Sequence, residues 1–341
     1  MAKLLSSWCK DAQSLPKNYV FPPDKRPGEL NSPVYSGPVV DLSKAVGQGQ
    51  AETIQQIIQA CQEFGFFQVI KHGVSGSLMH DTKNVMKEFF DMPDEVKSSV
   101  FTADASKRCR LFTSSLNYTN EEAYYWRDNL THPCHPWEDC MQLWPKKPTR
   151  YREVVGTYTV EVRKMILKVL DLICGGLGLE QGYFGGDLSK IELLSTNLYP
   201  RCPDPSLALG CHRHCDPNLI TFLDQGEVYG LQVCKDGQWI GVEPISNAFV
   251  VLIGCQLQII SNDKIRGPEH RVLTNSNKDR ISIGCFVIPT YECFIEPAKA
   301  LVSTCNPPLY RALQYKDFLS TYDEKIGNFR AVMECSKLQV Q

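Results

Sequence analysis

The sequence has no long hydrophobic run, no large excess of charge of one sign and no paired Cys-x-x-Cys modules. Without roughly 20 consecutive apolar residues, a membrane-spanning helix is not expected. Lys and Arg number 36 against 38 Asp and Glu, for a formal net charge of -2. Because this balance leaves no extended basic surface, we expect neither nucleic acid nor a membrane as a partner.

The cysteines are numerous but do not form a recognisable framework. There are 15 of them, an odd number with scattered spacing, and the first residues lack the apolar segment of a secretory signal. Free thiols in a reducing compartment explain this composition most simply. We therefore expect a cytoplasmic protein, and we expect it to be a monomer with a small-molecule substrate.

Hydrophobic periodicity divides the chain into a helical part and a β-rich part. Helical spacing predicts helices at 51–64, 78–90 and 151–177, with a buried strand at 66–70 and an irregular stretch at 91–148. The long helix is expected to end at the Gly175-Gly176 pair, and a last helix follows Tyr315. Short strands, typical of a sandwich or jelly roll, are predicted at 193–199, 218–223, 230–233, 239–242, 248–253, 257–261, 270–274, 281–287 and 292–296.

A short polar segment, His214-Cys215-Asp216, begins the part of the chain that carries chemistry. In an extended segment alternate side chains share one face, so the His214 imidazole and the Asp216 carboxylate converge. His270 opens a later predicted strand, which a jelly roll can bring beside the first. Two imidazoles and one carboxylate on one face of a metal are the ligand set of non-haem iron(II) oxygenases. Zinc more often draws a third His or a Cys, and Cys215 would face the opposite way.

A second polar pair, Arg280 and Ser282, lies on a predicted strand that follows His270. A buried guanidinium is costly unless it meets an anion, and its planar fork suits a carboxylate. We hypothesise that this anion is 2-oxoglutarate, whose far carboxylate binds Arg280 and Ser282 while its keto acid end chelates iron. Asn197 and Tyr199 share one face of an earlier strand and can hydrogen-bond the same molecule.

In combination, these motifs resemble the plant soluble 2-oxoglutarate- and Fe(II)-dependent dioxygenase family over nearly the whole chain. Segments at 15–20, 125–128 and 306–310 are similar to the group containing hyoscyamine 6-hydroxylase-like and salicylate hydroxylase-like enzymes. The motifs stand in the family's order as Phe64-Gly65-Phe66-Phe67-Gln68-Val69, Asn197-x-Tyr199-Pro200-x-Cys202-Pro203, His214-x-Asp216-Pro217-Asn218, His270-Arg271-Val272 and Arg280-x-Ser282.

The resemblance implies an α+β fold with a double-stranded β-helix (jelly roll) core, flanking N-terminal helices and a C-terminal helix. Residues 1–150 would form the N-terminal helical and lid region, and 151–341 the long helix and catalytic core, as one integrated unit. The site residues implied are His214, Asp216 and His270 for iron, and Arg280, Ser282, Tyr199 and Asn197 for 2-oxoglutarate.

The same resemblance implies a reaction that consumes Fe(II)-bound 2-oxoglutarate and O2, with ascorbate as an optional reductant. A small plant specialised metabolite or phenolic hormone would be hydroxylated, with release of succinate and CO2. The lid at 108–117 carries no acid, which favours a neutral or anionic phenolic over a cationic alkaloid. We expect substrate contacts at Phe112, Leu116, Tyr125 and Phe286.

Several positions depart from the family pattern. Lys71 stands where the family has Asn, Cys255 stands where it has Asp, and Cys211-His212-Arg213 precedes the first ligand. We expect this last segment to place an imidazole and a guanidinium near the mouth of the site. The segment 132–135, with two histidines and a cysteine, fits no strong zinc pattern and is expected to be a loop.

Three alternatives remain at the level of the sequence. One is an iron oxidase of the same fold that takes all its electrons from its own substrate and does not use 2-oxoglutarate. Another is desaturation, demethylation or epoxidation at the same centre, on an alkaloid for example. The third is a binding jelly roll without catalysis, which would be expected to have lost a ligand or Arg280.

Overall fold

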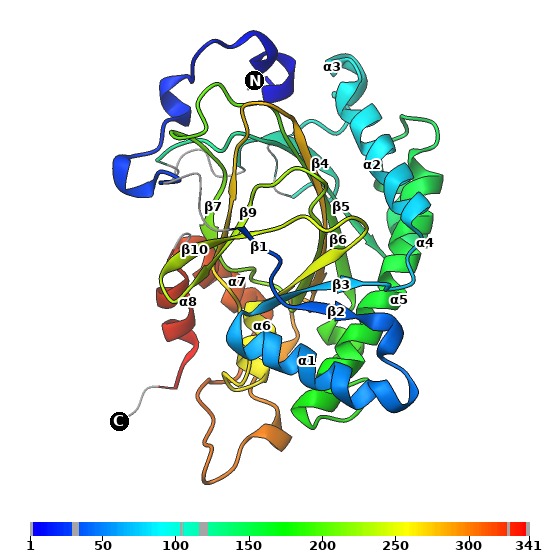
Figure 1. Cartoon of the computed structure of the whole chain (residues 1–341), viewed down its shortest axis with the longest axis vertical. Helices are drawn as coiled ribbons and strands as arrows, with labels where there is room; N and C mark the ends of the chain where they lie inside the picture. The colour runs from blue at the N-terminus through cyan, green and yellow to red at the C-terminus, as the bar shows by residue number, and fades with distance from the viewer. Residues whose placement is uncertain are drawn as a thin grey trace.

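Two facing β-sheets form the centre of the molecule, and helices cover its outside (Figure 1). The computed structural model describes residues 3–28, 34–102, 104, 106–115, 122–325 and 328–338. The expected α+β jelly roll with flanking N-terminal and C-terminal helices is confirmed. Apolar side chains from the sheets and from the N-terminal helices share one buried core.

The larger sheet has the strand order β2-β3-β11-β8-β13-β6-β5-β4. Only the β2–β3 pair in it is parallel, and the other described ladders are antiparallel. Its strands are β2 (Val39–Asp41), β3 (Phe66–Ile70), β4 (Arg110–Thr113), β5 (Asp128–His135), β6 (Ile191–Tyr199), β8 (Ile220–Asp224), β11 (Phe249–Ile253) and β13 (Arg280–Ile288).

The smaller sheet has the order β1-β10-β9-β12-β7 and supplies the opposite wall. Its strands are β1 (Val34–Tyr35), β7 (Leu209–His214), β9 (Leu231–Lys235), β10 (Gln238–Val242) and β12 (His270–Leu273). A separate two-stranded sheet pairs β14 (Phe294–Ile295) with β15 (Leu313–Gln314). Tyr199 of the larger sheet packs on Cys211 and Val272 of the smaller one, so the two sheets meet across the interior.

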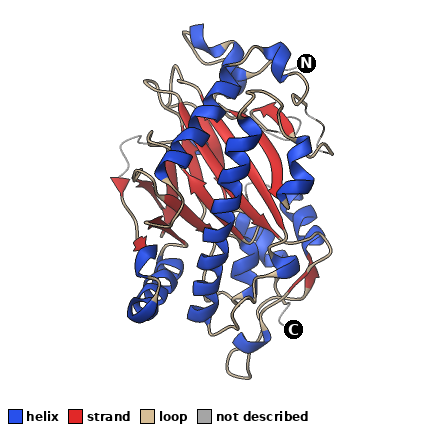
Figure 2. Ribbon diagram, turned by 90° about the vertical axis from the view of Figure 1, so that its right-hand side faces the viewer, coloured by secondary structure: helices blue, strands red, loops and turns tan. Residues whose placement is uncertain are grey.

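Long helices lie across the outer face of the larger sheet (Figure 2). The longest, α5 (Tyr151–Leu177), buries its apolar face there and ends at Gly178, whose φ of 74° only glycine adopts readily. The helix therefore spans the predicted 151–177 and includes the Gly175-Gly176 pair. A side chain at Gly176 would overlap Ile58 of α1, so this glycine is a packing contact between helices.

Both α1 and α2 pack against α5. Among the described residues, no helix combines the length and the apolar character needed to cross a membrane. The remaining α-helices are α1 (Gln50–Glu63), α2 (Gly76–Asp91), α3 (Asp94–Lys97), α4 (Trp137–Cys140), α6 (Cys255–Ile260), α7 (Tyr315–Glu324) and α8 (Phe329–Ser336). Short 3-10 helices lie at Leu5–Ser7, Cys9–Asp11, Lys17–Tyr19, Pro23–Lys25, Leu42–Lys44, Gly47–Gly49, Met141–Leu143, Gly186–Leu188 and Lys299–Leu301.

Two of the expected elements were wrong. The segment 257–261 was expected to be a strand but belongs mostly to α6, which is buried on every side and so shows no helical periodicity. The stretch 91–148 was expected to be irregular but contains β4 and β5. Pro133 lies inside β5 beside a register shift, and a proline within a strand conceals it from pattern analysis. The segment 132–135 is thus strand and not loop.

Candidate active site

Three side chains from two neighbouring strands converge inside the barrel. His214 ends β7 and His270 begins β12, and the two residues are direct partners in the β7–β12 ladder. Their ring centroids lie 4.2 Å apart. Asp216 follows the end of β7, and its Oδ1 lies 3.6 Å from Nε2 of each histidine. The site predicted from these three residues therefore comes together in space, with one donor atom of each within 4.8 Å of the others.

Hydrogen bonds hold both histidines in orientation. Nδ1 of His214 donates to the His212 carbonyl oxygen at 2.8 Å, and Nδ1 of His270 donates to the Pro268 carbonyl oxygen at 3.1 Å. This arrangement leaves both Nε2 atoms to face Asp216. Partners of this kind fix the tautomer of a metal-binding histidine and aim its free nitrogen.

The pKa values of the two histidines shift in opposite directions. Burial lowers the pKa of His270, and the charge of His214 lowers it further. Burial also acts to lower the pKa of His214, but Cys211 and Asp216 outweigh it and raise that pKa to about 9. Two imidazoles and one carboxylate, with room for further ligands, are a donor set that fits Fe(II).

Arg280 offers a binding position for an anion. Its side chain is 2% exposed, and its Nε donates to the Val228 carbonyl oxygen at 3.0 Å. The two terminal nitrogens have no hydrogen-bond partner among the described residues. Burial lowers the pKa of this guanidinium, and the nearby Tyr199 opposes that effect. Buried donors without acceptors are costly, so a carboxylate such as that of 2-oxoglutarate fits here.

The neighbours of Arg280 form a polar wall on the larger sheet. In the β13–β6 ladder Arg280 is opposite Tyr199, and Ser282 is opposite Asn197. The Asn197 Oδ1 accepts hydrogen bonds from Asn129 Nδ2 at 2.8 Å and from an Arg127 terminal nitrogen at 3.2 Å. The four cosubstrate residues predicted from the sequence thus lie together on the larger sheet. Tyr199 of this group packs on Cys211 of β7, the strand that ends at His214.

Comparison with known proteins agrees with this geometry. The sequence pattern described as the 2OG-Fe(II) oxygenase superfamily matches residues 190–289, and that described as non-haem dioxygenase in morphine synthesis N-terminal matches 38–147. Over its full length the chain is 44% identical to hyoscyamine 6-dioxygenase from Hyoscyamus niger, of which it covers 100%. The chain belongs to the 2OG-Fe(II) oxygenase superfamily.

Two further relatives support the assignment. The oxygenase is 42% identical to 2'-deoxymugineic-acid 2'-dioxygenase from Hordeum vulgare, with 92% of each chain covered. A crystal structure of JOX2 in complex with 2OG, Fe and JA matches it with a TM-score of 0.88 and 31% identity, over 99% of this chain and 98% of that one. The protein is therefore a 2-oxoglutarate-dependent dioxygenase with Fe(II) and 2-oxoglutarate as its cofactors, which decides against the oxidase and the non-catalytic alternatives.

The predicted substrate residues of the oxygenase are only partly placed. Phe112 on β4 and Tyr125 are buried, and Phe286 is half-buried on the strand of Arg280 and Ser282. The Tyr125 ring stacks on the His212 ring with centroids 5.0 Å apart, so the segment that follows the expected lid contacts the triad strand. Leu116 lies outside the described residues, as does part of the expected lid.

The departures from the family pattern have local structural roles. Lys71 has a φ of 49° and donates to Asp41 at 2.8 Å on the surface. The Cys255 backbone N–H donates to the Asp216 carbonyl oxygen at 2.9 Å. Arg213, which was expected near the mouth of the site, is exposed and pairs with Glu269, the residue before His270. The β7–β12 ladder has a register shift between the pairs of His270 and Val272, so side chains do not alternate regularly along this part of β7.

Some supporting residues of the oxygenase were missed in the sequence. Thr221 donates a 2.6 Å hydrogen bond to Asp216 Oδ2. Gly230 leaves room for the Arg280 side chain, because a Cβ at this position would lie 3.1 Å from Arg280 Cδ. Arg127 and Asn129 come from β5 and the residue before it, a segment that had been read as irregular. A single threonine or glycine forms no recognisable sequence motif, so these roles become visible only from the contacts in the folded structure.

A groove of about 740 Å³ lies away from this site, between the N-terminal segment and α2. It is lined by Leu198 and Ile281, which alternate with Tyr199 and Arg280 and so face the other side of the larger sheet. Its location on the outer face means that it is not the substrate pocket of the oxygenase.

Proposed function

We propose that this oxygenase hydroxylates a small plant specialised metabolite or phenolic hormone at an iron ion held by His214, Asp216 and His270. The observation that carries the proposal is the convergence of these two imidazoles and one carboxylate, each fixed by a hydrogen bond of its own. The far carboxylate of 2-oxoglutarate would bind Arg280, whose buried terminal nitrogens need an acceptor. Ser282, Tyr199 and Asn197 would complete the cosubstrate site.

The residues of the chain orient the reactants and keep water away from them. The oxidant would be O2, which bound iron would activate; the substrate and 2-oxoglutarate would each give two electrons, and the cosubstrate would leave as succinate and CO2. Arg280 neutralises and aligns the far carboxylate, and Thr221 keeps one oxygen of Asp216 turned toward the metal position. The buried aromatic side chains of Phe112 and Tyr125 limit the entry of water, which strengthens each charged contact inside.

The charge around the site favours a neutral or anionic phenolic substrate. Arg127 donates to Asn197 and lies near Tyr199 and Cys211, so a positive charge faces the interior beside the cosubstrate wall. A cationic amine placed there would be repelled, whereas a phenolate or carboxylate would be attracted. The second candidate is an alkaloid, which the 44% identity to hyoscyamine 6-dioxygenase favours.

A coupled assay tests the function and the substrate class together. Purified chain loaded with Fe(II) and supplied with 2-oxoglutarate would be incubated with plant phenolic acids, flavonoids and tropane alkaloids in competition. We expect succinate in equal amount to a product that has gained one oxygen. Loss of two hydrogens or of a methyl group would instead mean desaturation or demethylation. A tertiary amine as the best substrate would overturn the charge argument, and its product would identify the alkaloid function.

We also propose that the chain acts as a cytoplasmic monomer without a nucleic-acid partner, and that residues 1–150 and 151–341 form one unit. Support for the single unit comes from the larger sheet, in which β3 pairs with β11 and β5 pairs with β6. Light scattering of the purified protein tests the monomer, and limited proteolysis tests the single unit.

A further inference from the structure

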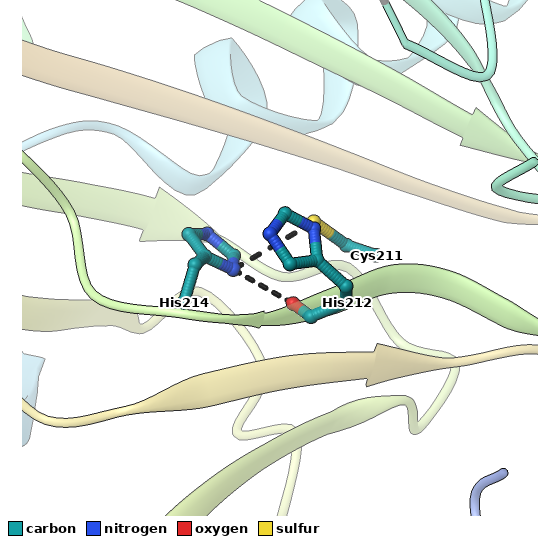
Figure 3. Close-up of side chains that lie close together, drawn as sticks. All are labelled: Cys211, His212 and His214. Atoms are coloured by element: carbon teal, nitrogen blue, oxygen red, sulfur yellow. Dashed lines mark hydrogen bonds between the residues drawn. The ribbon is translucent and has the colours of Figure 1, made fainter. Parts of the chain in front are cut away.

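A second group of metal-binding side chains lies directly beside the triad. Cys211, His212 and His214 are close together on β7, with one donor atom of each within 4.8 Å of the others (Figure 3). The Cys211 Sγ lies 3.8 Å from Nδ1 of His214. None of the roles assigned above uses the Cys211 sulfur or the His212 ring nitrogens as ligands, although both residues border the candidate active site.

The His214 imidazole separates the two groups. Its Nε2 lies 3.6 Å from Asp216, on the side of the triad. Its Nδ1 faces the other way, toward the Cys211 sulfur and the His212 carbonyl oxygen, as the dashed lines in Figure 3 show. One ring can therefore present a nitrogen to each of two cations.

His212 is the unusual member of the group. Both of its ring nitrogens are shielded from solvent and have no hydrogen-bond partner among the described residues. The ring lies between those of Tyr125 and His214, with centroids at 5.0 and 5.4 Å. By contrast, both ring nitrogens of His72 and of His132 have partners. A shielded imidazole without a partner is destabilising unless a ligand binds it.

The chemistry of these donors selects the type of cation. A sulfur and two imidazoles suit Zn²⁺ and other thiophilic ions, whereas Mg²⁺ and Ca²⁺ prefer oxygen. Tetrahedral zinc places a sulfur and a nitrogen ligand roughly 3.5 Å apart, close to the observed Cys211–His214 separation. We propose that Cys211, His212 and Nδ1 of His214 form a second site for a thiophilic divalent cation, with Zn²⁺ as the reference ion and water as the fourth ligand.

Occupation of this second site would change the triad. The cation replaces the thiol proton of Cys211 and the Nδ1 proton of His214, so the His214 hydrogen bond to the His212 carbonyl is lost. That hydrogen bond orients the ring toward the triad, and the two cations also repel each other. Arg127, which lies near Cys211, adds to the repulsion. Zinc in the second site therefore weakens iron binding and inhibits the enzyme.

Cobalt is the probe that separates the second site from the triad, because a Co²⁺–thiolate bond has a near-ultraviolet charge-transfer band. The full-length chain would be stripped of metal, kept under argon with 2-oxoglutarate and titrated with Co²⁺. We expect the band in the wild type and its loss in Cys211→Ser. The control Cys305→Ser removes an exposed cysteine and should keep the band, and Asp216→Ala, which breaks only the triad, should keep it as well.

Zinc stoichiometry by equilibrium dialysis gives the second readout. We expect Cys211→Ser and His212→Gln each to bind about one Zn²⁺ fewer per chain than the wild type. The proposal is wrong if the cobalt band is missing in the wild type, if it survives Cys211→Ser, or if the dialysis values are equal. It does not rest on the proposed function, because succinate release by the iron-loaded enzyme is measured without zinc or cobalt.

Discussion

The Thr221 hydroxyl donates a 2.6 Å hydrogen bond to Oδ2 of Asp216 and leaves Oδ1 facing both histidines. Thr221 is held in turn by Asn218, whose Nδ2 donates to the Thr221 oxygen at 3.1 Å. All three side chains are buried. The carboxylate of the triad is thus aimed by a hydroxyl on β8, a strand of the larger sheet, although both histidines belong to the smaller one.

Replacing Thr221 with Val removes this hydrogen bond while keeping the shape of the side chain. Because the carboxylate is then free to rotate, we expect Fe(II) affinity and turnover to fall by about 10- to 100-fold. Iron titration followed by succinate release measures both quantities. Thr221→Ser keeps the hydroxyl and should retain most of the activity; equal losses in the two variants would show that the hydroxyl has no orienting role.

Replacing Arg280 with Gln removes the charge that we assign to the far carboxylate of 2-oxoglutarate. Charge-assisted hydrogen bonds contribute about 1.5 to 3 kcal/mol each, so we expect the KM for 2-oxoglutarate to rise by roughly 100-fold. Iron affinity should change little. The matched control is Arg201→Gln, an exposed arginine paired with Asp279 near the end of the same wall. An unchanged KM in Arg280→Gln would place the cosubstrate elsewhere.

Gly230 makes room for the Arg280 side chain. A Cβ at this position would lie 3.1 Å from Arg280 Cδ and 3.2 Å from its Nε, so Gly230→Ala must displace the guanidinium by a few tenths of an ångström. We expect the KM for 2-oxoglutarate to rise by about tenfold, since misplacement of a clamp weakens binding steeply. Gly237→Ala, on a surface turn, controls for effects on stability alone. A KM equal to the wild-type value would show that the residues around Arg280 shift to accommodate the added methyl group without displacing the guanidinium.

His132 predicts a pH dependence of stability. It is buried as a neutral ring, with Nδ1 donating to the Pro133 carbonyl and Nε2 accepting from the Tyr151 hydroxyl. Burial lowers its pKa from 6.5 to about 4. The unfolded chain then binds more protons between these values, so the contribution to stability is complete above pH 6.5 and is lost as the pH falls toward 4.

Urea unfolding at pH 7 and pH 5 measures this loss. For the wild type we expect His132 to contribute a decrease of about 2 kcal/mol in the free energy of unfolding between the two pH values. The variant His132→Gln cannot take up the proton, so its decrease should be smaller by that amount. Parallel decreases in the two proteins would mean that the ring is solvated before the chain unfolds.

Much of the fold followed from periodicity. The helix of residues 151–177 and the buried strand at 66–70 were placed correctly, because their apolar spacing reflects which face is buried. Elements without one apolar and one polar face were missed, and so was a strand that contains proline. The α6 helix is buried on all sides, and β5 contains Pro133.

The triad residues could be selected from the sequence because histidine and aspartate at strand ends are rare in an apolar β-core. Arg280 could be selected for the same reason, since a buried guanidinium requires an anion. Thr221, Gly230 and Arg127 could not, because their roles depend on contacts between strands far apart in the chain. The orientation of Arg213 could not be read either, because the register shift between β7 and β12 at this point is set by strand pairing.

The most direct test of the central claim is an anaerobic crystal structure of the chain with Fe(II) and 2-oxoglutarate. We predict an iron ion bound by Nε2 of His214, a carboxylate oxygen of Asp216 and Nε2 of His270, with the far carboxylate of 2-oxoglutarate on Arg280. Iron bound away from these three residues, or a cosubstrate that does not contact Arg280, would contradict the account.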